Sequence, residues 1–579
     1  MRQPAKFCVV RTGVLWGVLL TLAAWSYAQT AVQARLLLDD EAMAHCAVYV
    51  VDIERRGSET RGALVAELPN GWRAVYPMDL ATNTRKRLYL PVPSDNRARR
   101  FRHAELLWRG ADGERVKVDL PTPLQTRLPI VFVGNAIGGW ERLNETVAPF
   151  VSALATNSDS QRMHAYYLRP AALPDDWRGL LGLPVLVLVD GAEALSDGQW
   201  QAVRQWLAAG GALVVSAGSF GAAVNLLPLA DLVPRLSLSD APVRPVTTPL
   251  APPNQPVRLM RPETLQDYGI LLGDARAPVM LYRRVGAGNL YLFLGDLGDP
   301  LWRDWGGLPT LMGWVTLSSG FLTERWGQVF DTEKRHEPLV QVRQVWVSVG
   351  LLGGYFVAVW VLAAWLRRRR RLASVAAPLT GLTLLASVGA IALAPRTTGA
   401  PRATRYLYRA PDAPAVEAIQ IRGAGRAGTH TIRLPEGALV LPADEGAPVE
   451  VWYATDAPEV RLRAGSWTEV QVVCLRLTRE APQVEARRVG NAVHLHNRSQ
   501  GDLHAVQLRR RDGERSGSAV LWTLPVLRAG QSVRVPMSET LPVEPNLRFV
   551  AEWQPDAPSG ALWNGTPIEE VSQLFVWVR

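Results

Sequence analysis

The sequence predicts a multidomain α+β membrane protein, and three observations carry this prediction. Two uncharged stretches of 22 and 23 residues flank five consecutive arginines, which is typical of two transmembrane helices joined by a short turn. Strand and helix patterns alternate over residues 128–320, as they do in an α/β domain with a parallel sheet. Short runs with a period of two residues occur before and after these regions, and they indicate β-sandwich or sandwich-like domains.

Residues 1–28 are interpreted as a signal peptide or an uncleaved signal anchor. Three positive charges precede an apolar stretch, and "SYA" ending at Ala28 fits a small-x-small cleavage site. Residues 35–125 follow with runs such as "ALVAELP" and "KRLYLPVP", separated by the turn sequences "PNG", "PSDN" and "GADGE". Alternating runs between such turns predict an antiparallel β-sandwich.

Residues 128–320 are predicted to form the α/β domain. The segments "PVLVLVD" and "ALVVS" are apolar strands. Between them, Ser196 or Asp197 can cap a helix whose apolar residues repeat on one face, and Gly210–Gly211 ends it. Strands and helices that alternate at this length predict a parallel sheet covered on both faces.

Two segments of this domain, "VLVLVDGAEALSDGQWQAVRQWLAAGGALVVSAG" and "GAGNLYLFLGDLGDPLW", resemble the class I glutamine amidotransferase-like fold as it occurs in bacterial membrane proteins of uncharacterised function. The resemblance implies a flavodoxin-like α/β domain, followed by two transmembrane helices with a basic turn and a C-terminal β region. Proteins of this layout are often encoded near AAA-type ATPases and von Willebrand factor A proteins. The resemblance therefore also implies a membrane complex with partners of these kinds.

An amidotransferase of this class needs a cysteine on a strand-to-helix turn and a histidine downstream of it. No cysteine lies in the domain, and the turn after "ALVVS" offers Ser216 or Ser219 instead. The downstream histidine would be His336, next to the first predicted span, while His164 precedes the turn. The sequence therefore predicts that the catalytic triad is absent, and it leaves Ser219 and Asp296 as weak catalytic candidates.

Carboxylates follow the predicted strands: Asp190 ends one strand, and Asp296 and Asp299 end another. Because α/β sheets place ligand sites at such strand ends, these groups could share a metal or a substrate. They also cap helices and accept hydrogen bonds in turns, and we favour this structural role. No cofactor is predicted, since the "GAGN" turn (Gly286–Asn289) lacks the strand before it and the helix after it that a phosphate loop needs.

The transmembrane hairpin is predicted over residues 345–366 and 372–394, with a cytoplasmic turn made of Arg367, Arg368, Arg369, Arg370 and Arg371. Each stretch is long enough to cross a hydrocarbon layer of about 30 Å. Short arginine-rich loops stay in the cytoplasm, so both large parts of the chain are expected on the periplasmic or extracytoplasmic side. The predicted location is the inner membrane, as a multi-pass protein in contact with the lipid bilayer.

Two β domains are predicted after the hairpin, at residues 396–480 and, with a sandwich-like pattern, at 481–579. His494 and His496 lie two residues apart on a predicted strand and face the same side, and His504 can lie opposite them. Three imidazoles could hold zinc. Because no cysteine or carboxylate spacing supports such a site, these histidines are weak metal candidates.

The charge distribution argues against nucleic acid as a partner. The formal charge is +10, but three positive charges lie in the signal segment and five in the arginine turn, which leaves +2 for the remaining residues. No basic field for a polyanion remains. Outside the signal segment the cysteines are Cys46 and Cys474, which could form one bridge, although two buried thiols are the favoured interpretation.

These observations favour a non-catalytic function. We expect a membrane-anchored envelope protein that acts as an interaction platform or scaffold for a membrane complex. One alternative is an envelope hydrolase or amidotransferase-like enzyme that uses a serine of the α/β domain. A second is a carbohydrate-binding envelope protein, which exposed members of the 21 tryptophans on a β face would support.

Overall fold

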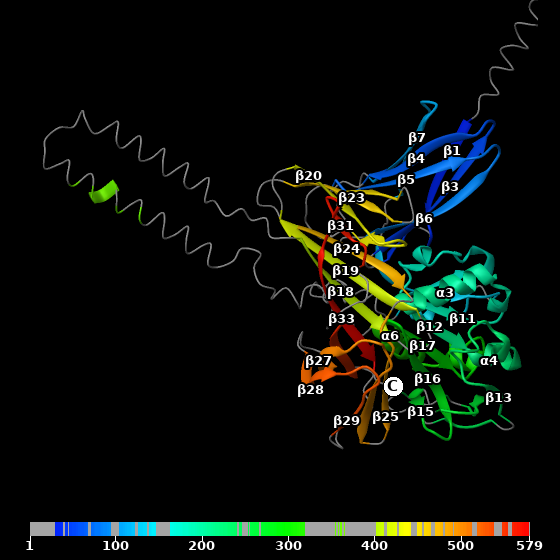
Figure 1. Cartoon of the computed structure of the whole chain (residues 1–579). Helices are drawn as coiled ribbons and strands as arrows, with labels where there is room; N and C mark the ends of the chain where they lie inside the picture. Colours follow the sequence, from blue (N-terminus) through cyan, green and yellow to red (C-terminus); the bar gives the residue numbers. More distant parts are fainter. Residues whose placement is uncertain are drawn as a thin grey trace, which may run out of the picture.

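The computed structural model describes residues 29–318 and 401–577 with internal gaps, together with six positions between 354 and 364. The described part is mostly β, with sheets of eight, eight and nine strands and three smaller sheets. In Figure 1 the α/β region (green) lies beside the C-terminal strands (yellow to red), and the N-terminal strands (blue) lie at the top. The gaps are residues 39–40, 44–45, 68–70, 94–103, 122–124, 136–137, 146–162, 240–241, 246–249, 251–252, 254, 266–267, 410–413, 425–427, 442–448, 454–456, 465–468, 479–480, 490, 512–517, 538–546 and 554–558.

A small antiparallel sheet begins the described chain. It contains, in spatial order, β1 (Gln29–Leu36), β3 (Cys46–Arg56) and β6 (Arg85–Pro93). Successive side chains of a strand point to opposite faces, and in β1 the alternate residues Thr30, Val32 and Leu36 are buried. One face of this sheet therefore belongs to a hydrophobic core.

A nine-stranded sheet combines residues from both ends of the chain. Its order is β32 (Thr566–Pro567), β31 (Leu562–Trp563), β20 (Gly428–Arg433), β23 (Glu459–Ala464), β22 (Val449–Trp452), β5 (Arg73–Leu80), β4 (Thr60–Glu67), β7 (Glu105–Gly110) and β8 (Arg115–Asp119). The two halves meet where β5 pairs in parallel with β22, with Arg73 opposite Glu450. Leu64 and Val460 lie in the same buried cluster, so the predicted segments 35–125 and 396–480 share one core.

The α/β region contains an eight-stranded sheet. Its order is β10 (Met163–Leu168), β9 (Gln125–Val133), β11 (Val185–Leu188), β12 (Ala212–Ser216), β17 (Gly288–Phe293), β16 (Pro278–Val285) and β15 (Gly269–Gly273), and β2 (Glu41–Met43) pairs with β9. The strands from β10 to β17 in this order are parallel, whereas β16 and β15 are antiparallel. Every side chain of β11, β12 and β17 is buried, as in a sheet with both faces covered.

The helix after β11 has strong local signals at both ends. In α3 (Asp197–Ala209), the Ser196 hydroxyl accepts from the Gln199 N–H at 3.3 Å, and the Gln199 side chain accepts from the Ser196 N–H at 2.9 Å. Gly210, with φ of 131°, ends the helix. The shorter elements of this region are α2 (Arg142–Glu145), η2 (Pro170–Ala172), η3 (Trp177–Leu180), η4 (Ala192–Ala194), α4 (Ala217–Phe220), η5 (Gly221–Leu226), α5 (Pro300–Arg303), α6 (Leu308–Ser318) and the pair β13 (Leu236–Leu238) and β14 (Met260–Pro262).

A second eight-stranded sheet crosses the predicted boundary at residue 480. Its order is β21 (Leu439–Leu441), β24 (Glu469–Thr478), β19 (Ala415–Ala424), β18 (Arg402–Arg409), β33 (Glu569–Trp577), β30 (Leu547–Trp553), β27 (Leu503–Arg511) and β28 (Ser518–Leu527). The strand near the C-terminus, β33, pairs in parallel with β18. A separate three-stranded sheet contains β25 (Val484–Val489), β26 (Ala492–Asn497) and β29 (Ser532–Pro536).

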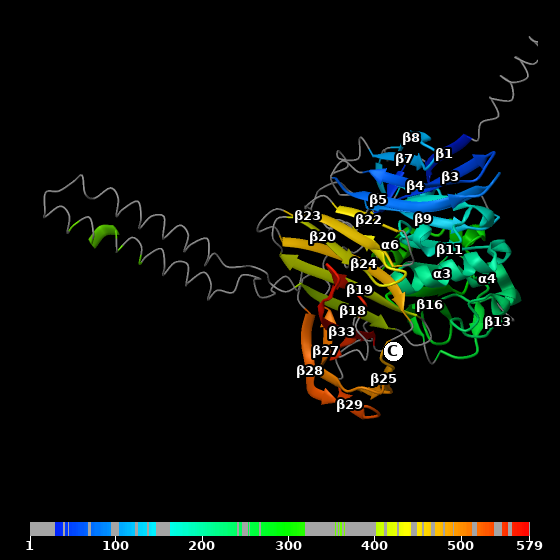
Figure 2. The same cartoon turned by 45° about the horizontal axis from the view of Figure 1, so that its top comes forward.

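This C-terminal sheet joins all three hydrophobic cores. On one face, Tyr406 and Val416 pack into the core of the α/β region. On the opposite face, Ile419 packs into the core of the nine-stranded sheet, and Leu407 and Leu574 pack into the core of the three-stranded sheet. Figure 2, in which the top of Figure 1 is tilted forward by 45°, also shows β18, β19 and β33 beside the α/β region.

The predicted transmembrane hairpin needs correction. No helix among the described residues is long and apolar enough to cross a membrane. Helix α3, with 13 residues, spans about 20 Å, whereas a hydrocarbon layer is about 30 Å thick. The predicted α+β membrane fold class and the multi-pass inner-membrane location are corrected by this finding, and the described chain is mostly β.

Most residues on which the hairpin prediction was based lie outside the described part of the chain. The signal segment 1–28, the arginine turn 367–371 and the second span 372–394 are outside the described residues. Of the span 345–366, six separate helical positions are described, among them Val357 and Trp360, which are exposed.

Candidate functional site

Two neighbouring parallel strands bring Ser219 and Asp296 to the same edge of the α/β sheet. Strand β12 ends at Ser216, which lies opposite Phe293 at the end of β17. Ser219 lies in α4, directly after β12, and Asp296 lies in the loop after β17. The carboxyl ends of parallel strands meet at this edge, where α/β sheets bind ligands. This edge is therefore the candidate site.

Ser216, Ser219 and Asp296 form one connected set of hydrogen bonds. The two serine hydroxyls are 2.6 Å apart, and the Ser219 hydroxyl donates to Asp296 Oδ1 at 2.5 Å. The fully buried Ser216 hydroxyl accepts from the Leu297 N–H at 2.9 Å. Asp296 Oδ1 also accepts from the Gly298 N–H at 2.8 Å. The set joins the turn after β12 to the loop after β17.

A close approach of two backbones strengthens this connection. The Gly218 N–H donates to the Gly295 carbonyl at 2.9 Å. A Cβ atom added at Gly218 would lie 2.4 Å from the Asp296 nitrogen, a distance that real Cβ atoms essentially never show. Because the opposing atoms belong to the backbone and not to a movable side chain, glycine is required at this position.

The described residues at this edge include no imidazole that could act as a base for a serine. His164 lies at the start of β10, three strands away from β12 and toward the opposite edge of the sheet. Three strand spacings amount to about 14 Å. His336 lies outside the described residues, and the other described histidines belong to the C-terminal strands. Among the described residues, the Ser219 hydroxyl therefore has the Asp296 carboxylate and the Ser216 hydroxyl as partners, and no imidazole.

The other strand-end carboxylates have positions that suit turns. Asp299 Oδ1 accepts from the Leu301 N–H at 2.9 Å and caps α5. Asp190 is exposed, and its carbonyl accepts from the Asn135 N–H at 2.8 Å. Within the described ranges, no group of three or more histidine, cysteine, aspartate or glutamate side chains could hold a metal ion.

The three histidines considered for zinc are divided between two sheets. His494 and His496 lie on β26, whereas His504 lies on β27 of the eight-stranded sheet. His494 lies directly between Arg487 and Arg534 of the neighbouring strands. Two positive neighbours disfavour a divalent cation at His494 electrostatically.

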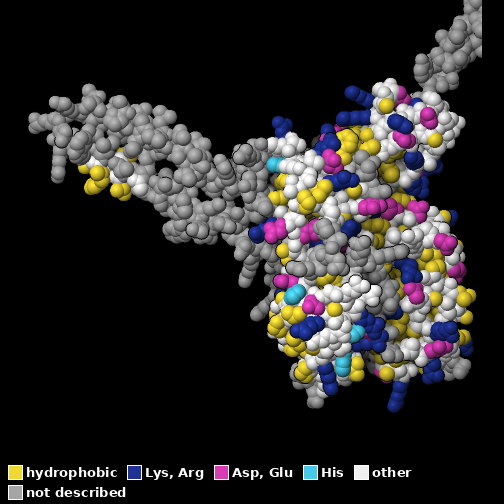
Figure 3. Space-filling model, viewed as in Figure 1, with side chains coloured by type: hydrophobic (Ala, Val, Ile, Leu, Met, Phe, Trp, Pro, Cys, Tyr) yellow, Lys and Arg dark blue, Asp and Glu magenta, His cyan; other side chains and the backbone are white. Residues whose placement is uncertain are grey.

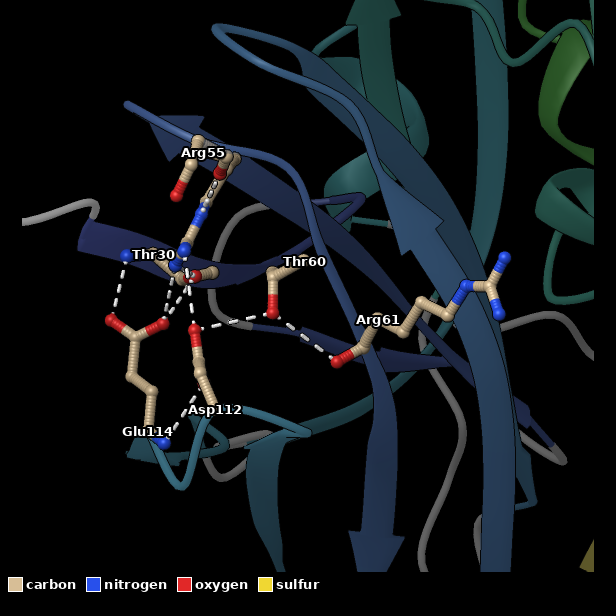
Figure 4. A network of polar contacts seen from close by, with 7 residues as sticks. Thr30, Arg55, Thr60, Arg61, Asp112 and Glu114 are labelled. Atoms are coloured by element: carbon tan, nitrogen blue, oxygen red, sulfur yellow. Dashed lines mark hydrogen bonds and ion pairs between the residues drawn. The ribbon is translucent and has the colours of Figure 1, made fainter.

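A buried arginine that the sequence did not reveal organises the N-terminal strands. The Arg55 side chain is 2% exposed, and its guanidinium donates to Glu114 Oε2 at 2.7 Å and to Asp112 Oδ2 at 3.2 Å. The Thr30 N–H and hydroxyl donate to the same Glu114 carboxylate at 2.8 and 2.6 Å. Figure 4 shows these groups meeting where β1, β3 and the turn after β7 come together. The network connects three segments, which is a structural role.

A second buried ion network lies in the C-terminal sheet. Arg405 on β18 and Arg476 on β24 both donate to the fully buried Glu417 carboxylate on β19. Arg405 also lies 3.4 Å from Glu570 on β33. One signal in the sequence could have found this network, because Arg405 shares a strand face with the apolar Leu407.

Cys474 is a free and fully buried thiol, and burial raises its pKa to about 12. It therefore does not bridge to Cys46. No tryptophan with a described side chain on a strand is exposed. Trp452 on β22 is half-buried, and the Arg461 guanidinium lies 4.6 Å from its ring centroid. The described strands thus lack the exposed row of rings that a carbohydrate-binding face requires.

An open cavity of about 430 Å³ lies at the seam between β5 and β22. Inside it, Arg73 forms ion pairs with Glu67 at 2.5 Å and with Glu450 at 3.2 Å. The cavity lining holds two carboxylates, Glu67 and Glu450, and three arginines, so its acidic groups are compensated by basic ones. The lining residues are Glu67, Gly71, Trp72, Arg73, Thr429, Val449, Glu450, Arg461, Leu462 and Arg463.

Comparisons with known proteins add little. No family model matches the chain, and no curated protein matches its sequence. The cytoplasmic protein STM1381 of Salmonella typhimurium LT2 is similar over 33% of this chain and 100% of its own, with 13% identity and a TM-score of 0.24. The cytoplasmic protein STM3548 of Salmonella typhimurium is similar over 33% of this chain and 98% of its own, with 11% identity and a TM-score of 0.23. The exo-β-1,4-mannosidase Op5Man5 of Opitutaceae bacterium strain TAV5 is similar over 34% of this chain and 36% of its own, with 15% identity and a TM-score of 0.21. TM-scores at this level do not indicate a shared fold.

Proposed function

We propose that the protein is a non-catalytic interaction platform, a scaffold that presents binding surfaces in a fixed arrangement. The observation that carries this proposal is the engagement of Ser216, Ser219 and Asp296 with each other and with backbone groups of the opposite loop. A nucleophilic serine needs a base and room for a substrate carbonyl beside it. Here the serines hold two loops together instead.

The way the sheets are shared supports the same proposal. The β5–β22 pairing joins the strands before the α/β region to strands after it, and the C-terminal sheet contacts all three cores. Large shared apolar cores resist relative motion of the parts they connect, because separation would expose that surface to water. Surfaces on different parts of the chain then keep a constant spacing, which suits a scaffold.

A serine-directed probe tests the proposal against the hydrolase alternative. The purified full chain is treated with a fluorophosphonate and with a panel of ester and amide substrates, alongside Ser219→Ala and Asp296→Asn. If the protein is a non-catalytic platform, the probe should not label Ser219. Any substrate turnover should then be the same in the unmodified chain and in both variants. Labelling of Ser219 with turnover that Ser219→Ala abolishes would show an enzyme and overturn the proposal.

A stability measurement provides the positive side of this test. Ser219→Ala removes two hydrogen bonds of the loop connection, so it is expected to lower the thermal unfolding midpoint. Ser237→Ala is the matched control, because Ser237 is exposed and its contact to the Arg261 carbonyl is long, at 3.4 Å. Equal midpoints for the two variants would contradict the structural role of Ser219.

A further inference from the structure

The open cavity at the seam between β5 and β22 has a charged wall and an apolar floor. Its volume of about 430 Å³ lies within the range of about 300–1,000 Å³ that is typical of small-molecule sites. The floor contains Trp72 and Leu462, which are buried in the core of the nine-stranded sheet, and the half-buried Val449. In Figure 3, basic (dark blue) and acidic (magenta) side chains lie close together near the strands that Figure 1 labels β5, β20 and β23.

The charged side chains in the middle of the wall are arranged in pairs. Arg461 on β23 lies directly opposite Glu450 on β22, and Glu450 lies directly opposite Arg73 on β5. Arg73 in turn lies directly opposite Glu67 on β4. Cations and carboxylates therefore alternate across these neighbouring strands, and opposite charges on facing residues stabilise a sheet.

Two of the three arginines in the lining are therefore already bound to carboxylates. Arg73 lies 2.5 Å from Glu67 and 3.2 Å from Glu450. Partial burial opposes the charge of Arg73, but the two carboxylates outweigh it and raise the Arg73 pKa above its ordinary value. Arg461 lies 2.8 Å from Glu459, outside the cavity. Neither arginine needs a further anion.

The third arginine of the lining, Arg463, differs from the other two. On the neighbouring strand β20 it lies directly opposite Thr429, which carries no charge. Both side chains are exposed, and among the described residues the Arg463 guanidinium has no ion-pair partner. A guanidinium can hold a carboxylate through two parallel N–H bonds, and a threonine hydroxyl can donate a further one. Arg463 and Thr429 therefore offer a carboxylate site beside the apolar floor.

We propose that this cavity binds a small organic monocarboxylate, with its carboxylate on Arg463 and Thr429 and its apolar body against Trp72 and Leu462. The charges of the lining support a single negative charge, because three arginines stand against two glutamates. A phosphate monoester carries about −1.5 to −2 at neutral pH, and its second charge would be repelled by the two glutamates. An inorganic anion would leave the apolar floor in contact with water.

This inference goes beyond the proposed function, because it concerns a small ligand on a different sheet from the serine network. The two proposals can fail separately. A cavity that binds no carboxylate would leave the platform proposal intact. Catalysis that depends on Ser219 would overturn the platform and leave the carboxylate site intact.

Fluorine NMR of para-fluorophenylacetate in the presence of the full chain tests the proposal. This probe has one carboxylate and an aromatic body, and para-fluorophenylacetamide is its neutral counterpart. Line broadening is measured over about 0.1–10 mM, because so small a ligand binds weakly. We expect the acid to bind at least about tenfold more tightly than the amide, because hydrogen bonds between charged groups are stronger than those between neutral ones. Added salt should weaken binding of the acid.

Two variants and a matched control locate the site. Arg463→Gln removes the cation and should lower the affinity for the acid at least about tenfold, with the affinity for the amide unchanged. Thr429→Glu places a carboxylate directly opposite Arg463, which competes with the probe and should also lower its affinity. Arg433→Gln is the control, because Arg433 is an exposed arginine at the other end of β20 and outside the lining. It should bind the acid as the unmodified chain does.

Three results would overturn the inference. The first is no binding of the acid up to about 10 mM. The second is equal affinity for the acid and the amide, and the third is an unchanged affinity for the acid in Arg463→Gln. Far-ultraviolet circular dichroism verifies folding of each variant. Because Arg463 and Thr429 are both exposed, either variant can replace the other if one does not fold.

Discussion

Replacing Glu417 with glutamine removes the central charge of the buried network in the C-terminal sheet. The Glu417 side chain is fully buried, Arg405 is 3% exposed and Arg476 is 15% exposed. Glutamine keeps the size and shape of the side chain, so the change tests electrostatics and hydrogen bonding without a cavity. Both arginines lose Glu417 as a carboxylate partner, and Arg405 has almost no access to water.

The size of the effect follows from this burial. Removing one partner of a buried ion pair costs about 3–5 kcal/mol, because an uncompensated charge remains in the interior. Arg405 keeps Glu570 at 3.4 Å, and Arg476 is partly accessible to water. Both facts reduce the penalty, so we expect the free energy of unfolding to fall by about 3 kcal/mol, the lower end of this range.

The neighbouring glutamate on β33 provides a matched control. Glu569 is 69% exposed and lies 3.7 Å from Arg402, which is 59% exposed. An exposed pair of this kind contributes about 0–1 kcal/mol, so Glu569→Gln should leave stability nearly unchanged. The assay is urea unfolding followed by circular dichroism, with hydrogen exchange of β18 and β19 peptides as a local reading. A Glu417→Gln variant as stable as the control would refute the reasoning.

Three further predictions concern other sites. Iodoacetamide should modify Cys474 in urea but not in the folded protein, because burial raises its pKa to about 12, and mass spectrometry of the Cys474 peptide measures this. Gly218→Ala should lower the unfolding midpoint, whereas Gly501→Ala, with nothing within 4 Å of its added Cβ, should not. Burial opposes ionisation of Asp231, but the Arg204 guanidinium at 2.6 and 2.7 Å outweighs it and lowers the Asp231 pKa. The ionised Asp231 therefore stabilises the folded protein at pH values above the pKa of aspartate in the unfolded chain. This stabilisation is lost as the pH falls through the lower Asp231 pKa of the folded protein. Asp231→Asn removes the titrating group, so the free energy of unfolding should depend less on pH in this acidic window.

The segment from β11 to β12 was predictable because its signals are local. The capping residue Ser196, the apolar face of the helix and Gly210 at its end all act within a few residues of each other. The apolar strands on either side also follow from short runs. Such features depend on neighbouring residues, so tertiary contacts do not alter them.

The candidate site was predictable only as separate residues. Ser219 and Asp296 stand at strand ends in the sequence, but their contact at 2.5 Å depends on β12 lying next to β17. In the chain, the strands β13 to β16 and the short helices α4 and η5 lie between β12 and β17. No local sequence pattern indicates which strands become neighbours in the sheet. The absence of cysteine from the domain was visible directly.

The transmembrane prediction was based on composition alone, on two uncharged stretches and the arginine turn between them. Uncharged length and an arginine turn indicated a membrane hairpin, yet the described residues contain no helix that meets the requirement for crossing a membrane. Buried arginines were missed for a related reason. Arg55 occurs in a charged-looking run, and its burial depends on Asp112 and Glu114, which are far away in the chain.

The sequence by itself determined the alternating β segments, the α3 unit with its caps, and the lack of a cysteine nucleophile in the α/β region. Tertiary structure decided that β5 joins β22, that β18 joins β33, and that Glu417 is enclosed by two arginines. The physical reason is that strand pairing uses backbone groups common to all residues. Partner choice then depends on the burial of whole faces, which no single segment encodes.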